Sequence, residues 1–105
     1  MMAAMDPFKP YQPRQVSTPV KLADEDAEAI ALSAVAFIAA DDSLLSRFVA
    51  LTGCGLDDLR ARIADRAFLG AVLDFLMGDE ATVVAFAEHE GFPPETTMLA
   101  RAKLP

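Results

Sequence analysis

A spacing of phenylalanine, aspartate and glycine that occurs twice limits the folds open to this chain. The pattern is Phe-x3-Asp-x6-Phe-x4-Gly, and its two copies lie 38 residues apart. They comprise Phe37, Asp41, Phe48 and Gly53, followed by Phe75, Asp79, Phe86 and Gly91. Aspartate favours the first residues of a helix and glycine favours its end. Each copy therefore predicts a helical hairpin, and the four phenylalanines are expected to anchor both hairpins in one core.

Hydrophobic periodicity favours helices through residues 24–105. Apolar residues recur on one helical face from Asp24 to Ala40, and the acidic start of this stretch suits the positive end of a helix. Further helices are expected at about 44–51, 57–64 and 66–77, after Asp79, and at 94–103. No segment alternates with a period of two, so strands are not expected. The sequence predicts an all-α fold, a compact bundle of about six short helices built from two pseudo-repeated helical hairpins.

The first 23 residues differ from the rest in composition and charge. They hold Pro7, Pro10, Pro13 and Pro19, which break helices. Three cations against one acid give this stretch a charge of +2; the whole chain carries −7, which leaves −9 for residues 24–105. We expect a disordered, basic, Pro-rich tail at 1–23 and one all-α domain at 24–105. Met5 is an alternative start.

Composition excludes several classes of function. The acidic balance argues against nucleic acid, which needs a basic surface. A single cysteine excludes an intrachain disulfide and favours a reducing compartment, and a single histidine excludes a multi-histidine metal site. The uncharged stretch 29–40 has 12 residues, too few to span a membrane. We expect a cytoplasmic protein that binds no nucleic acid, membrane, metal or cofactor.

Two side chains are weak candidates for a chemical role. Ser43 lies in Asp42-Ser43-Leu44, the tripeptide on which acyl carrier proteins accept phosphopantetheine, although the expected long preceding loop is missing. Cys54 lies between two glycines in a predicted turn, where a nearby base would make it reactive. His89 is the only histidine that can serve as that base, and no pattern places it beside Cys54.

Small residues line one face of each leading helix of the repeat. They are Ala29, Ser33, Ala36 and Ala40 in the first copy, and Ala67, Gly70, Ala71, Asp74 and Gly78 in the second. Such a face allows close helix packing, within the chain or between two copies in a homo-oligomer; the alternative is that it is simply the less buried side. Asp74 is expected to face solvent or to pair with Arg47, Arg60, Arg62 or Arg66.

The core contains a series of short motifs between about Ala27 and Ala102. The most specific are Asp58-Leu59-Arg60-x-Arg62, then Asp65, Phe68-Leu69-x2-Val72-Leu73-Asp74-Phe75-Leu76 and Asp79-Glu80. In these motifs the core resembles a family of short bacterial helical proteins known only as a domain of unknown function, and the resemblance covers about Ala27 to Ala102. It implies a compact helical domain and supplies no activity, cofactor or catalytic residue.

The leading functional hypothesis is a protein–protein interaction module with an unidentified protein partner. It follows from an acidic helical core, a basic tail and the lack of a convincing catalytic constellation. The chain is therefore not expected to be an enzyme, and no catalytic residue is assigned. The alternatives are an acyl-carrier-like protein modified at Ser43 and a small thiol-dependent enzyme that uses Cys54.

Overall fold

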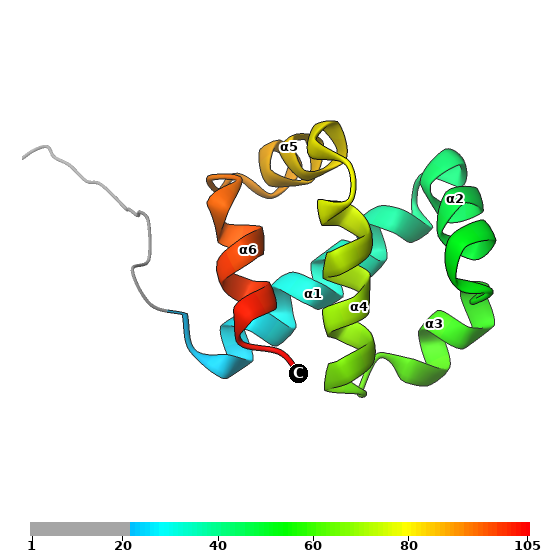
Figure 1. Ribbon diagram of the computed structural model, residues 1–105, viewed down its shortest axis with the longest axis horizontal. Helices are drawn as coiled ribbons and strands as arrows, with labels where there is room; N and C mark the ends of the chain where they lie inside the picture. Colours follow the sequence, from blue (N-terminus) through cyan, green and yellow to red (C-terminus); the bar gives the residue numbers. More distant parts are fainter. Residues whose placement is uncertain (1–21) are drawn as a thin grey trace, which may run out of the picture.

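The computed structural model describes residues 22–105, and six helices make up most of this part of the chain (Figure 1). They are α1 (Asp24–Ala39), α2 (Asp42–Thr52), α3 (Leu56–Arg62), α4 (Arg66–Met77), α5 (Glu80–Glu90) and α6 (Glu95–Ala102). Residues 22–105 contain no strand, which confirms the all-α prediction. Met5 and the predicted tail as far as residue 21 lie outside the described residues. Leu22, which we had assigned to the tail, is buried in the core.

Helix α1 lies at the centre of the fold and packs mainly against α4, α6 and α2. Its fully buried side chains are Ala27, Ala31, Ala34 and Ile38, which recur at helical spacing as the sequence predicted. Three of these four residues are alanines, so α4 and α6 can approach the α1 backbone closely. Small residues therefore do mediate packing of α1, but they lie on its predicted core face.

The repeated aspartates and glycines perform matching tasks in both halves of the chain. Asp41 accepts hydrogen bonds from the backbone amides of α2, and Asp79 accepts one from the backbone of α5. Gly53 and Gly91 end these two helices with φ angles of 75° and 81°, in the left-handed region that favours glycine. The chain turns by 108° between α1 and α2, so this pair forms an open corner. The pseudo-repeat of whole hairpins stays a prediction.

The four phenylalanines of the repeat contact one another in two pairs. Phe37 and Phe86 have ring centroids 5.3 Å apart, and Phe48 and Phe75 have theirs 5.1 Å apart. All four belong to or pack against one hydrophobic core, as expected. Phe48 and Phe86 are fully buried, whereas Phe37 and Phe75 are only half-buried at its edge. The second phenylalanine of each copy of the repeat is therefore more deeply buried in the core than the first.

The predicted small-residue faces are mostly exposed, with one exception. Ala29 and Ala36 in α1 and Ala40 directly after it are exposed, as are Ala67 and Ala71 in α4. Gly70 is buried because the segment after α6 passes over it; a Cβ built there would lie 2.8 Å from the carbonyl oxygen of Pro105. The less buried side is thus the correct interpretation for most of these residues, and close approach applies to Gly70.

Asp74 is exposed, which was one of the two predicted alternatives, but the predicted partners were wrong. Its carboxylate accepts a hydrogen bond of 2.7 Å from Nε of Arg101 in α6, which was not among the four arginines considered. Arg101 also donates through Nη1 to the carbonyl oxygens of Leu104 and Pro105. One guanidinium therefore joins α4 to the segment that follows α6.

No single helix within residues 22–105 is long and apolar enough to cross a membrane. Helices α1 and α2 satisfy the length and composition criteria only when taken together across their bend.

Candidate functional site

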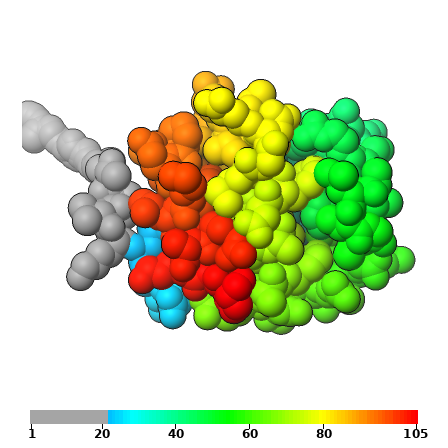
Figure 2. Space-filling model, viewed as in Figure 1, coloured from blue at the N-terminus to red at the C-terminus, as the bar shows by residue number. Residues whose placement is uncertain are grey.

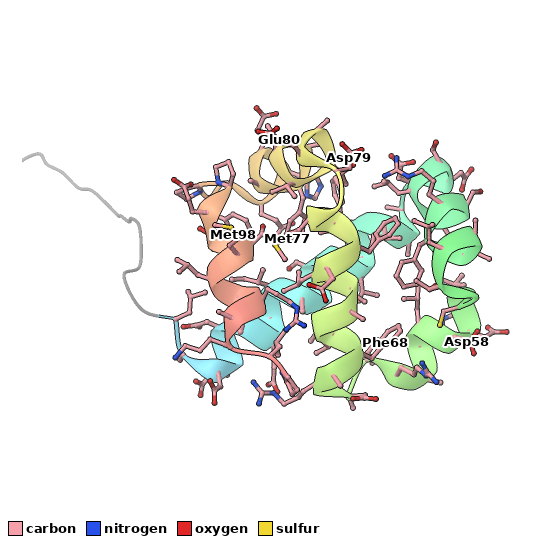
Figure 3. The ribbon with its side chains drawn as sticks, viewed as in Figure 1. Asp58, Phe68, Met77, Asp79, Glu80 and Met98 are labelled. Atoms are coloured by element: carbon pink, nitrogen blue, oxygen red, sulfur yellow. The ribbon has the colours of Figure 1, made fainter. Side chains whose placement is uncertain are left out.

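An apolar groove lies where the end of α4, the first half of α5 and the start of α6 meet. It has a volume of about 340 Å³ and is lined by Met77, Glu80, Val83, Val84, Pro94, Glu95 and Met98. Figure 3 shows Met77 on α4 and Met98 on α6 on the two sides of this region, with Glu80 at the start of α5. Figure 2 shows the same face, where the atoms of α6 adjoin those of α4 and α5. We call this surface the Met77–Met98 groove.

Helix α5 contributes to the groove because it is apolar on two sides. Phe86 and Ala87 face the core, while Val83 and Val84 lie on the side toward α6. Val84 remains 37% exposed, and Met98 on the facing helix is 60% exposed. Methionine is unbranched and polarizable, so it adapts to differently shaped apolar partners and makes favourable contacts with aromatic rings. The groove thus presents adaptable apolar surface to solvent.

Both charged residues that line the groove are acidic. Glu80 begins α5 and Glu95 begins α6. Within residues 22–105, neither carboxylate forms an ion pair, whereas Glu28, Asp74 and Asp79 are each paired with an arginine. The groove therefore combines an apolar floor with an uncompensated negative rim among the described residues. This combination favours apolar ligands that also carry positive charge.

Asp79 fixes the position at which α5 begins, directly before Glu80. Its carboxylate accepts hydrogen bonds from the Thr82 hydroxyl at 2.9 Å and from the Ala81 amide at 3.1 Å, and lies 3.5 Å from Arg47. The hydrogen bond from Thr82 lowers the pKa of Asp79 most; partial burial opposes this, and the Ala81 amide and Arg47 lower it further. Asp79 is thus a charged cap that holds the start of α5.

A second hollow lies between α1 and the α3–α4 connection. It measures about 390 Å³ and is lined by Glu28, Leu32, Ile63, Ala64 and Leu69. Its acidic residue is already engaged, because Glu28 lies 2.8 Å from Nε of Arg66. Leu32 and Ile63 leave some apolar surface exposed there, but the hollow lacks a free charged rim. It is the weaker candidate for binding.

Ser43 is exposed at the second residue of α2. Its backbone amide donates to Asp41, which is the N-cap of α2. Nothing among the described residues tests phosphopantetheine attachment, and the carrier hypothesis stays a prediction.

Cys54 and His89 lie in different parts of the molecule. Cys54 follows α2 and is half-buried, with its Sγ 3.9 Å from the carbonyl oxygen of Thr52. His89 lies in the last turn of α5, where Nδ1 is 3.0 Å from Glu90 and the ring packs against Phe37. Figure 1 shows the α2–α3 turn well separated from the end of α5. The structure does not bring the proposed base to the thiol, and a role for Cys54 by other means stays a prediction.

The groove residues were not singled out by the sequence interpretation. Met77 and Met98 belong to the helices predicted at 66–77 and 94–103, but their convergence requires the angle between α4, α5 and α6. The available signal was the run 83–87, whose five residues are all apolar and therefore cover the whole circumference of the helix instead of one core face. An apolar residue left on the outer side of a short helix indicates an additional contact surface.

The fold and this surface define a small acidic all-α domain with a groove lined by apolar side chains and two carboxylates. Residues 24–105 match the family model described as "Protein of unknown function (DUF3572)", and the chain belongs to that family. The match confirms the resemblance to a domain of unknown function. No curated protein and no solved structure matches the chain.

Proposed function

We propose that this chain is a protein-docking module and that its partner binds in the Met77–Met98 groove. The single observation that carries the proposal is the exposure of Met98 and Val84 in a groove that Glu80 and Glu95 also line. Exposed apolar surface of this kind, rimmed by polar groups, is typical of interaction sites. The partner chemistry that fits is a peptide segment with apolar or aromatic side chains next to lysine or arginine.

A reducing compartment such as the cytoplasm is consistent with this proposal. Cys54 is a free thiol, and the chain has no second cysteine with which to form an internal disulfide. Docking in the groove requires no disulfide, cofactor or metal, so the interaction depends only on shape, apolar contact and charge.

A random peptide library displayed on phage tests the proposal with the full chain as bait. We expect enriched peptides to combine apolar or aromatic residues with Lys or Arg. Each peptide should bind the wild type in fluorescence anisotropy, and binding should be lost with Val84→Asp and Met98→Asp. Leu51→Asp is the matched control, because Leu51 is 75% exposed on α2, outside the groove. Far-UV circular dichroism checks that each variant is folded. Peptide binding that survives both groove substitutions would exclude the groove as the docking site.

A further inference from the structure

Residues 7–15 consist of three successive triplets that each begin with proline. They read Pro7-Phe8-Lys9, Pro10-Tyr11-Gln12 and Pro13-Arg14-Gln15. Proline favours the polyproline II conformation, which has three residues per turn and rises about 9 Å per turn. A chain in that conformation carries Phe8, Tyr11 and Arg14 on one side. In a polyproline II helix the triplets would therefore place two aromatic side chains and one cation in a row along one side.

We propose that this segment, residues 7–15, is the ligand of the Met77–Met98 groove within its own chain. The inference rests on the proposed function, since it names an occupant for the same groove. Phe8 and Tyr11 contact the methionines, and the cations Lys9 and Arg14 face the carboxylates of the rim. A bound segment of this kind makes docking of an external partner competitive with the chain's own N-terminal residues.

Charge complementarity is the first argument for this occupant. Residues 1–21 carry three cations and one acid, a charge of +2, which leaves −9 for residues 22–105. The groove holds two carboxylates without a cationic partner among the described residues, and its floor is methionine and valine. Sulfur–aromatic contacts add to the apolar contact where Phe or Tyr meets Met. The segment supplies positive charge for the two carboxylates and aromatic rings for the methionines.

The length of the intervening chain is the second argument. Leu22 is buried in the same cluster as Leu104, and Figure 1 shows the start of α1 beside the end of α6. The groove lies at the opposite end of α6, which has 8 residues and is therefore about 12 Å long. The eleven residue-to-residue steps from Tyr11 to Leu22 span up to about 36–40 Å when extended. The intervening chain is therefore long enough to reach the groove from Leu22.

The methionines of the chain supply the probe for a direct test. Met77 and Met98 are the only methionines outside the first five residues, so ¹³C-methyl labelling gives the groove two resonances of its own, assigned with Met77→Leu and Met98→Leu. In the full chain we expect a nuclear Overhauser effect between the Tyr11 ring and the Met98 methyl group. Phe8→Ala with Tyr11→Ala should abolish it and move both groove resonances by more than a linewidth. Gln12→Ala with Gln15→Ala is the matched control and should leave both unchanged.

A charge exchange tests the polar part of the proposal. Glu80→Lys with Glu95→Lys should abolish the Tyr11–Met98 contact, and adding Lys9→Glu with Arg14→Glu should restore it. Groove resonances that do not respond to Phe8→Ala with Tyr11→Ala would overturn the proposal. A contact whose intensity falls on dilution would place the segment of a second copy in the groove, and would also overturn it. Library peptides that still bind the groove in either case would show that the docking function stands without this occupant.

Discussion

The ring of Phe48 in α2 meets the ring of Phe75 in α4 edge to face, with centroids 5.1 Å apart and planes inclined at 88°. Phe48 is 1% exposed, whereas Phe75 is half-buried and has the guanidinium of Arg47 over its face, 5.8 Å from the ring centroid. The contact therefore joins a fully buried residue to one at the edge of the core.

This difference in burial predicts unequal effects of truncation. Phe48→Ala should lower the free energy of unfolding by about 3–5 kcal/mol, because it leaves a cavity in the core. Phe75→Ala should cost about 1–2 kcal/mol, because less apolar surface is lost from a half-buried ring. Urea unfolding followed by far-UV circular dichroism measures both, since the chain has no tryptophan to report by fluorescence. A larger loss for Phe75 than for Phe48 would contradict the burial shown by the structure.

Two threonines predict opposite outcomes for the same substitution. The Thr97 hydroxyl in α6 is buried and has no hydrogen-bond partner among residues 22–105, so Thr97→Val should raise the free energy of unfolding by about 1 kcal/mol. The hydroxyl of Thr82 donates to Asp79, so Thr82→Val should destabilise the domain. Thermal melts of the two variants and the wild type decide the matter. A destabilised Thr97→Val variant would show that its hydroxyl has a partner in solution.

Asp79 predicts a specific dependence of stability on pH. Its pKa lies below the ordinary value of 3.8, mainly because of the Thr82 hydroxyl. A lowered pKa in the folded state stabilises the domain fully above the unfolded value, and this contribution is lost as the pH falls through the folded value. Asp79→Asn keeps a capping oxygen but removes the charge, so its melting temperature should lie below that of the wild type at neutral pH. The gap should close as the pH drops below 3.8.

The control for this experiment is Thr82→Val, which removes the largest cause of the pKa shift. Its combination with Asp79→Asn should show a smaller pH-dependent gap than Asp79→Asn does in the wild-type background. An Asp79→Asn gap that is constant across the acid range would show that the carboxylate charge contributes nothing to stability.

The chain passes so close to Gly70 that Gly70→Ala, a substitution that normally stabilises a helix, is predicted to destabilise this one. Alanine normally stabilises a helix interior by about 1 kcal/mol relative to glycine. At Gly70 its Cβ would lie 2.8 Å from the carbonyl oxygen of Pro105 and 3.1 Å from Arg101, so Gly70→Ala should lower the melting temperature. Gly78→Ala is the control, because its nearest neighbour lies at 3.4 Å, and it should be neutral or slightly stabilising. Equal effects at both sites would mean that the segment after α6 is not held over α4.

The local elements of this fold were predictable because they depend on residues close in sequence. Asp41 caps the start of α2 and Gly53 caps its end. The helical spacing of apolar residues identified the buried face of α1, which contains Ile38. The partner of Asp74 was not predictable in this way, because Arg101 reaches it only after α6 folds across α4.

The candidate site was less predictable than the helices. Its residues come from three helices and the turn before α6, and Glu80 alone among them was quoted from the sequence, as part of the family resemblance and not as a site residue. Only the relative orientation of α4, α5 and α6 determines that Met77, Val84 and Met98 share one surface. Periodicity predicts which side of a single helix is buried, and it does not predict which exposed apolar residues of different helices will meet.

The contact of α1 with α6 has a consequence for how the chain is made. A ribosome releases α1 first, yet one face of α1 packs against α6, the last helix of the described residues. Until α6 emerges, that face stays open to water and to other nascent chains. We therefore expect chains that end before α6 to aggregate more readily than the whole domain, because apolar surface that α6 would cover stays exposed.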